Sequence, residues 1–122
     1  MSEPLDLPIR PRRLRLNPIL RRMLHRVTLR TSDFILPVFV CEGSGVKKEV
    51  GSMPGVYQMS VDVALQWLQE RAGEGFGSFI AFGVIDRKQK DSTGSPALDE
   101  NNIVCRLLRA TDQAKLPMVS MT

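Results

Sequence analysis

Histidine, cysteine and aromatic side chains are all scarce in this chain of 122 residues. It has one histidine, His25, and two cysteines, Cys41 and Cys105, with no CxxC spacing between the cysteines. That composition excludes a zinc finger or a similar structural zinc set. Two cysteines so far apart in sequence are typical of free thiols in a reducing compartment, so we predict a cytoplasmic protein.

Long apolar runs and several familiar motifs are also missing. No run approaches the roughly 18 apolar residues that a membrane span requires, and the N-terminus lacks the layout of a secretory signal. We therefore expect no membrane partner. The chain has no Walker loop, and the glycines of Gly73-Glu-Gly75-Phe-Gly77 follow a helical pattern instead of a strand, which argues against a dinucleotide fingerprint.

Charge is unevenly distributed along the chain, which has a net charge of +4. Residues 1–30 hold eight arginines against Glu3 and Asp6, a balance of +6, whereas residues 31–122 hold nine basic and eleven acidic side chains, a balance of −2. A basic segment on a mildly acidic body can bind nucleic acid, an anionic surface or the acidic body of a neighbouring subunit.

The first 30 residues are predicted to form an N-terminal arm with a short basic amphipathic helix. Several prolines favour extended backbone over residues 1–16. Asn17-Pro18 is a typical helix start, with Asn at the N-cap and Pro in the first turn. The apolar residues that follow lie on one stripe, which needs a surface to dock on: Ile19, Leu20, Met23, Leu24 and Val27.

Residues 31–122 alternate between apolar runs and amphipathic segments. Residues 34–41 and 78–84 are typical of strands buried on both faces, and Pro37 indicates a free strand edge at that point. Helices are predicted at 61–72, capped by Ser60, and again after a cap at Asp99 or Asn101, with a third strand at 118–121. The segments between them are predicted loops, the first with a small hairpin. This alternation predicts an α/β fold of parallel βαβ units, and the pattern alone leaves both a doubly wound sheet and part of a barrel open.

Four segments, in this order, resemble one enzyme family. They are Arg10-Pro-Arg-Arg-Leu-Arg-Leu-Asn-Pro18, Leu36-Pro-Val-Phe-Val40 with Glu42-Gly-Ser-Gly45, Ser52-Met-Pro-Gly-Val-Tyr-Gln-Met-Ser-Val-Asp62, and Phe82-Gly-Val84 with Lys90-Asp91 and Gly94-Ser95. Together they resemble the N-terminal portion of porphobilinogen synthase (5-aminolevulinate dehydratase). The resemblance implies an extended arm over residues 1–30 and, over 31–122, the first three β/α units of a TIM (β/α)8 barrel. The barrel would be incomplete, because such barrels need about 250 residues.

The resemblance also implies a chemistry. The family is a hydro-lyase that condenses two molecules of 5-aminolevulinate into porphobilinogen for tetrapyrrole (heme) synthesis, with two Schiff-base lysines and with zinc or magnesium. It places both lysines and the cysteine-rich metal loop beyond Thr122. We therefore expect a truncated N-terminal part of the enzyme, with no catalytic residue, metal ligand or cofactor of its own and no activity alone.

Residues at the predicted strand ends are the candidates for a site. Lys90 and Asp91 match a family loop that we assign to the active-site rim. From the residues alone, Glu42 is either a general acid or base or a solvated carboxylate, and Lys88 and Lys90 lie in a polar loop that does not desolvate an amine for Schiff-base chemistry. 5-Aminolevulinate is expected to bind only in a complete enzyme.

The arm is expected to make the partner contacts, because the family's arm wraps neighbouring subunits of a homo-oligomer. The predicted contact residues are Arg10, Arg12, Arg13, Arg15, Leu20 and Leu24. A solvated basic tail is one alternative. Nucleic-acid binding is another, although the arm lacks aromatic side chains for base stacking. For the whole chain, the alternative function is a non-catalytic interaction protein that docks on a full-length relative through this arm.

Overall fold

The computed structural model describes residues 12–122, so the predictions for residues 1–11, including the start of the arm and the contact role of Arg10, lie outside it. The elements, with η marking a 3-10 turn, are η1 (Arg13–Arg15), α1 (Pro18–Met23), η2 (Thr31–Asp33), β1 (Ile35–Cys41), β2 (Lys47–Glu49), β3 (Tyr57–Met59), α2 (Val61–Gly73), β4 (Ser78–Val84), η3 (Arg87–Gln89), α3 (Ser95–Leu98), α4 (Ile103–Gln113) and β5 (Val119–Met121).

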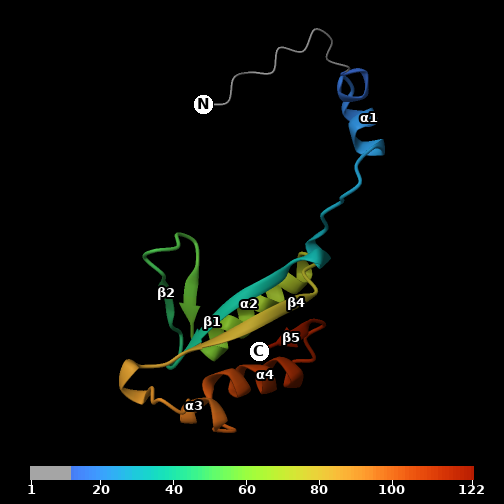
Figure 1. Ribbon diagram of the computed structural model, residues 1–122. Helices are drawn as coiled ribbons and strands as arrows, with labels where there is room; N and C mark the ends of the chain where they lie inside the picture. Colours follow the sequence, from blue (N-terminus) through green and yellow to red (C-terminus); the bar gives the residue numbers. More distant parts are fainter. Residues whose placement is uncertain (1–11) are drawn as a thin grey trace, which may run out of the picture.

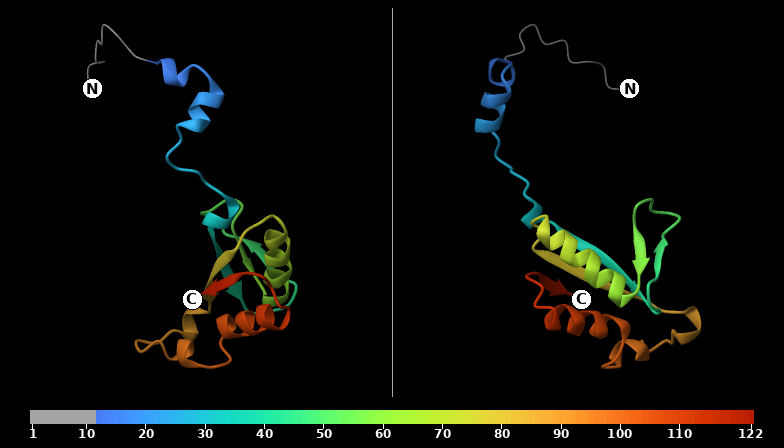
Figure 2. Two further views of the ribbon diagram at one scale, coloured as in Figure 1. Left: turned by 90° about the vertical axis from the view of Figure 1, so that its right-hand side faces the viewer. Right: turned by 180° about the vertical axis from the view of Figure 1, so that it is seen from behind.

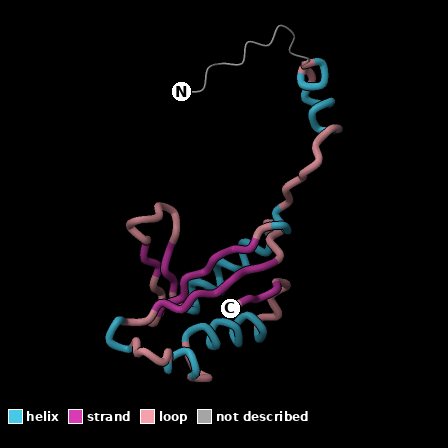
Figure 3. Tube along the Cα trace, viewed as in Figure 1, coloured by secondary structure: helices cyan, strands magenta, loops and turns pink. Residues whose placement is uncertain are grey.

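Five strands form one sheet in the order β2-β3-β1-β4-β5 (Figures 1 and 3). The neighbouring pairs β1–β4 and β4–β5 are parallel, and each pair is joined through a helix. The strands β2 and β3 form an antiparallel hairpin, and β3 also pairs in parallel with the end of β1. The predicted α/β class, the parallel βαβ units and the hairpin inside residues 42–60 are confirmed.

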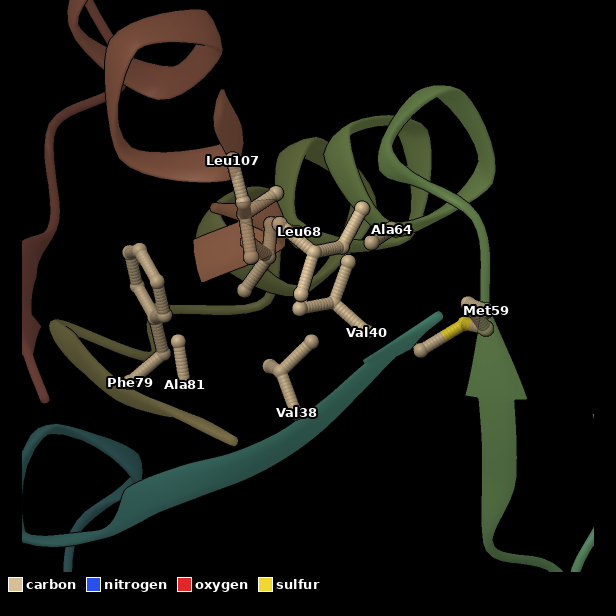
Figure 4. Close-up of a cluster of buried hydrophobic side chains, with 9 residues drawn as sticks. Val38, Val40, Met59, Ala64, Leu68, Phe79, Ala81 and Leu107 are labelled. Atoms are coloured by element: carbon tan, nitrogen blue, oxygen red, sulfur yellow. The ribbon is translucent and has the colours of Figure 1, made fainter. Parts of the chain in front are cut away.

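The hydrophobic core lies between the sheet and two helices on the same face (Figure 4). Alternate residues of β1 and β4 point toward α2 and α4, because successive side chains of a strand point to opposite faces. The fully or almost fully buried apolar residues are Val38, Val40, Met59, Ala64, Leu68, Phe79, Ala81, Ile103 and Leu107. This cluster fixes both helices on the strands that lead to the candidate site.

The other face of the sheet is open, which corrects the expectation that both strands would be buried on both faces. Phe39 of β1 and Phe82 of β4 stack here with ring centroids 5.5 Å apart, yet Phe82 is 44% exposed and Ile35 is 50% exposed. The pattern of continuous apolar residues is the same whether the second face is covered or not. The three parallel strands therefore leave apolar surface exposed on this face.

Pro37 lies where the predicted free edge is found. The strand β3 pairs with β1 only at Phe39 and Val40, whereas β4 pairs with all seven residues of β1. Beside Pro37, the described residues therefore provide a strand partner on the β4 side alone. A proline is tolerated at such an edge, because its nitrogen has no hydrogen to donate.

The helix starts were predicted with mixed success. Asn17 caps α1 as expected, and its Oδ1 accepts a hydrogen bond from Ile19 N at 2.7 Å. The cap of α4 is Asn102, whose Oδ1 accepts from Cys105 N at 2.9 Å, so the prediction of Asp99 or Asn101 is wrong by one to three residues. Asp99 instead accepts from Asn101 N in the turn before the helix.

The arm projects away from the sheet in all three views (Figures 1 and 2). The helix α1 contacts η1, and its residues are exposed. It ends at Met23, so Val27 lies beyond the helix and the predicted apolar stripe is shorter than expected. The apolar side chains of the described arm are therefore not covered by the body of the chain.

Candidate functional site

Parallel strands deliver their carboxyl ends to one edge of the sheet, which is where open α/β sheets and barrels carry their ligand sites. Here that edge is formed by the ends of β1, β4 and β5, with Cys41 paired beside Val84. Two segments continue from it, residues 42–46 after β1 and residues 85–102 after β4. We take these two segments and the start of α4 as the candidate site.

Hydrogen bonds hold the second half of the loop after β1, at Ser44 and Gly45. Asp62, in the first turn of α2, accepts a hydrogen bond from Gly45 N at 2.8 Å and a long one from the Ser44 hydroxyl at 3.4 Å. The Ser60 hydroxyl and the Gly45 N–H both lower the pKa of Asp62 below its ordinary value of 3.8. The loop reverses at Gly43 and Gly45, with φ of 119° and 68°, which favour glycine. Asp62 therefore ties a glycine-rich loop to the helix that follows it.

Ser60 has a different role from the predicted helix cap. It occupies the N-cap position of α2 but makes no side-chain cap hydrogen bond. Its fully buried hydroxyl instead accepts from Val46 N at 2.9 Å and donates to Val46 O at 3.4 Å. Ser60 thus closes the loop on itself where β2 begins.

The first half of the loop is held by an ion pair. Glu42, directly after β1, pairs with Arg106 of α4. Both side chains are partly exposed, at 61% for Glu42 and 43% for Arg106. Glu42 is therefore a largely solvated carboxylate that also has an ion-pair partner. It joins the segment after β1 to the helix that follows β4.

Lys90 and Asp91 lie in the predicted polar segment after β4. Asp91 accepts from Thr93 N and Thr93 Oγ1 at 3.1 Å each, from Ser95 N at 2.9 Å and from the Ser95 hydroxyl. These bonds, with the Ser95 hydroxyl the largest cause, lower the pKa of Asp91 from 3.8 to about 2. Asp91 therefore shapes the turn into α3, and Lys90 precedes that turn.

Neither cysteine has a metal-binding environment. Both thiols are free and half-buried, and burial, followed by the neighbouring Glu42 carboxylate, raises the pKa of the Cys41 thiol. Among residues 12–122, no group of three or more His, Cys, Asp and Glu side chains is placed to hold a metal ion. The described donors therefore do not fit the zinc or magnesium that the family resemblance implies.

A pocket of about 390 Å³ lies between the end of β4 and α4, and its lining is mostly apolar. Ala81 and Gly83 form the strand side, while Val104, Cys105 and Leu108 form the helix side. Lys90 and Asp91 are not part of its lining. The structure therefore does not bring the predicted rim residues together with the pocket.

The arm residues form a second, separate group. Arg12, Arg13 and Arg15 are exposed around η1, and Leu20 and Leu24 are 36% and 52% exposed. Arg15 and Leu24 line a hollow together with Leu14, Arg21 and His25. Within the described part of the arm, helix and turn contact each other and leave both charge and apolar surface available to a partner.

Arg106 and Asp62 are the residues of the site that the sequence did not reveal. Glu42 and Arg106 are 64 positions apart, and nothing local to either residue indicates the pair. Asp62 follows the helix cap by two residues, where an acidic side chain is expected to interact with the N-terminus of its own helix.

No helix among the described residues has the length and apolar character to cross a membrane.

Comparisons with known proteins place this arrangement in a family. A family model described as delta-aminolevulinic acid dehydratase matches residues 8–122. The curated relatives include delta-aminolevulinic acid dehydratases of Synechococcus elongatus, 49% identical over 70% of this chain and 26% of the relative, and of Helicobacter pylori, 46% identical over 82% and 31%. The dehydratase of Escherichia coli is 37% identical over 96% of this chain and 36% of its own length.

A solved structure has the same fold. The delta-aminolevulinic acid dehydratase (porphobilinogen synthase) of Toxoplasma gondii, solved with porphobilinogen, superposes with a TM-score of 0.83 at 24% identity, over 95% of this chain and 33% of the other. The chain thus spans about a third of the length of these relatives. Because the family match runs through the arm, both helices and the strand ends of the candidate site, the chain belongs to the delta-aminolevulinic acid dehydratase family.

Proposed function

We propose that this chain is the N-terminal third of a porphobilinogen synthase, an enzyme that condenses two molecules of 5-aminolevulinate into porphobilinogen in tetrapyrrole synthesis. The observation that carries the proposal is the family match over residues 8–122. It is supported by the Escherichia coli relative, which this chain matches over 117 residues. Two half-buried free thiols support a reducing compartment, and we propose the cytoplasm.

In this proposal β1, β4 and β5 are the first three strands of a TIM barrel. They are neighbours in the sheet and parallel, and the helices that connect them cover one face, as in a barrel with an outer helical ring. The open face, with Phe39 and Phe82, would then lie inside the barrel. The remaining strands would pair beyond β5, whose residues are all exposed.

The isolated chain is proposed to be inactive. A Schiff-base lysine must lose its proton, which requires desolvation or a nearby cation. Lys88 and Lys90 are exposed in a polar segment that does not desolvate their amines. The two lysines and the metal loop that the family resemblance implies would come from the other two thirds of the enzyme.

A chimera tests the function directly. In it this chain replaces the N-terminal part of the Escherichia coli dehydratase that it matches over 117 residues. We expect the chimera to form porphobilinogen from 5-aminolevulinate, measured by the colour reaction of the pyrrole, and the isolated chain to form none. A folded and assembled chimera without activity would contradict the proposal, and turnover by the isolated chain that a Lys88→Ala/Lys90→Ala variant abolishes would show that the chemistry is misassigned.

For the arm we propose contact with another subunit of a homo-oligomer. Its apolar residues support this, because electrostatic binding to nucleic acid needs charge alone, whereas an exposed apolar surface needs a covering partner. In the chimera, Leu20→Asp/Leu24→Asp should reduce the mass measured by light scattering. Arg12→Ala/Arg13→Ala should reduce it less, since exposed ion pairs contribute about 0–1 kcal/mol each. Unchanged mass in the leucine variant, together with loss of salt-dependent RNA binding in the arginine variant, would favour a nucleic-acid role instead.

The second candidate is a non-catalytic protein that docks on a full-length relative. The exposed arm is the observation that favours it. Mixing the isolated chain with an intact dehydratase distinguishes the two functions. A change in the mass of the intact enzyme, combined with an inactive chimera, would support docking over catalysis.

A further inference from the structure

The Glu42–Arg106 pair joins two segments of the candidate site. Glu42 begins the loop after β1, and Arg106 lies in the first turns of α4, which starts at Ile103. The pair therefore bridges two neighbouring connections at the carboxyl edge of the sheet, where a substrate of an α/β enzyme approaches.

Gly83 allows this bridge to form. It pairs with Val40, two residues before Glu42. A Cβ atom at Gly83 would lie only 3.1 Å from the Cγ2 atoms of Ile103 and Val104. Because glycine lacks that atom, the start of α4 packs closely on β4, and Arg106 comes within reach of Glu42.

Asp62 and Lys48 are other charged groups near the loop. Asp62 accepts hydrogen bonds from the loop at Gly45 and Ser44, and Lys48 is close enough to act on the Cys41 thiol. The ion-pair partner of the Glu42 carboxylate is Arg106. Removal of the Arg106 charge would therefore leave the Glu42 carboxylate without its ion-pair partner.

We infer that Arg106 is a positioning residue that neutralises Glu42 and holds residues 42–46, so that the site admits a substrate bearing a carboxylate. The inference rests on the proposed function, because 5-aminolevulinate is such a substrate. Arg106 acts through Glu42 and does not contact the reacting atoms. An unpaired Glu42 repels the incoming carboxylate, so its effect falls on substrate capture and leaves the chemical step unchanged.

The test uses the chimera and compares KM with kcat. Two like charges roughly 8 Å apart change an equilibrium by about two-fold in water and by about 30-fold at the effective dielectric constant of about 20 that applies near a protein surface. Arg106→Gln should therefore raise the KM for 5-aminolevulinate by a factor in this range while kcat is unchanged. The increase should disappear at 1 M salt, where the Debye length is about 3 Å.

Two further variants separate charge from structure. Glu42→Gln/Arg106→Gln should restore the KM, because it removes the repelling carboxylate along with its partner. Arg109→Gln is the matched control: Arg109 lies one turn further along α4, donates to Asn101 Oδ1 at 2.9 Å and to Glu100 O, and does not contact Glu42. It removes the same charge from the same helix and should leave KM unchanged.

Failure of this inference is distinct from failure of the proposed function. An active chimera in which Arg106→Gln leaves KM unchanged, or in which the double variant does not restore it, overturns the inference and leaves the function standing. An inactive chimera overturns the function. In that case hydrogen exchange still tests the hold on the loop: Arg106→Gln should speed exchange of the Gly45 and Val46 amides, which donate to Asp62 and Ser60, and unchanged rates refute the positioning role.

Discussion

The open face of the sheet should make the isolated chain self-associate. Phe82 and Met121, 44% and 36% exposed, lie on this face with Ile35, which is 50% exposed. The edge strand β5 is also exposed, which adds unpaired backbone groups. A replacement of Phe82 by threonine removes apolar surface from the centre of this face while keeping a residue that strands accept.

The size of the effect follows from the exposed area. A phenylalanine side chain that is 44% exposed presents roughly 90 Å² to water, since such side chains bury about 150–250 Å² in full. At about 25 cal/mol per Å², covering that area contributes roughly 2 kcal/mol to association, or about 30-fold in the dissociation constant. The variant also loses the stack with Phe39, 5.5 Å between centroids, which costs about 1 kcal/mol of folding stability.

Sedimentation velocity over a concentration series measures this association. We expect the isolated chain to form larger species and Phe82→Thr to need about 30-fold more protein to form them. Leu98→Thr is the control, because Leu98 is 81% exposed but lies at the end of α3, outside the sheet. A monodisperse wild-type monomer with a sharp, cooperative thermal transition would refute the reasoning and show that the open face needs no partner.

Three further predictions concern the site and the core and use the chimera. The hydrogen bonds of Asp91 lower its pKa in the folded chain from 3.8 to about 2. Their contribution to stability should therefore be complete above a pH of about 3.8 and should be lost as the pH falls through about 2. A carboxyl titration by NMR checks this, and a midpoint near pH 3.8 would contradict it. Gly83→Val should lower the stability by about 1–3 kcal/mol by pushing α4 off β4, whereas Gly77→Ala, with nothing within 4 Å of the added atom, should not; equal melting temperatures would contradict this. Leu68→Ala should lower the free energy of unfolding by about 2–5 kcal/mol, because Leu68 is fully buried. A decrease below about 1 kcal/mol in denaturant unfolding would contradict this and show that the core repacks around the missing side chain.

The local pattern of the sequence predicted most elements of the fold. The strand β4 has the predicted bounds, 78–84, and α2 extends one residue beyond the predicted 61–72. These segments carry their signal in neighbouring residues, because strand and helix periodicity repeat within two to four positions. The hairpin within 42–60 was predicted from turn residues for the same reason.

Burial of the strands could not be predicted in the same way. A continuous apolar run such as residues 34–41 has the same sequence pattern whether one face of the strand or both faces are covered. The structure distinguishes them: Val38 is fully buried under the helices, while Ile35 on the other face is half exposed. What covers a face is set by other elements, and the strand's own sequence carries no information about them.

The cap of α4 shows a related limit. Asp99, Asn101 and Asn102 are all suitable cap residues within four positions. Asn102 was selected because its side chain reaches Cys105 N while its Nδ2 donates to Ala97 O in α3. The second bond depends on where α3 lies. Cap propensity therefore limits the candidates to these three residues but does not identify Asn102.

The ion pair at the site depends on geometry over a longer range still. Arg106 reaches Glu42 only because α4 packs closely on β4, and that approach depends on the absence of a side chain at Gly83. Gly83 is in a strand run, where a glycine indicates close backbone approach but does not say by which element. Residues at strand ends could therefore be nominated from sequence as site candidates, whereas their partners are decided by helix packing. For this reason Lys90 and Asp91 were found by resemblance to a loop, and Arg106, which ties that edge of the sheet together, was found only in the folded chain.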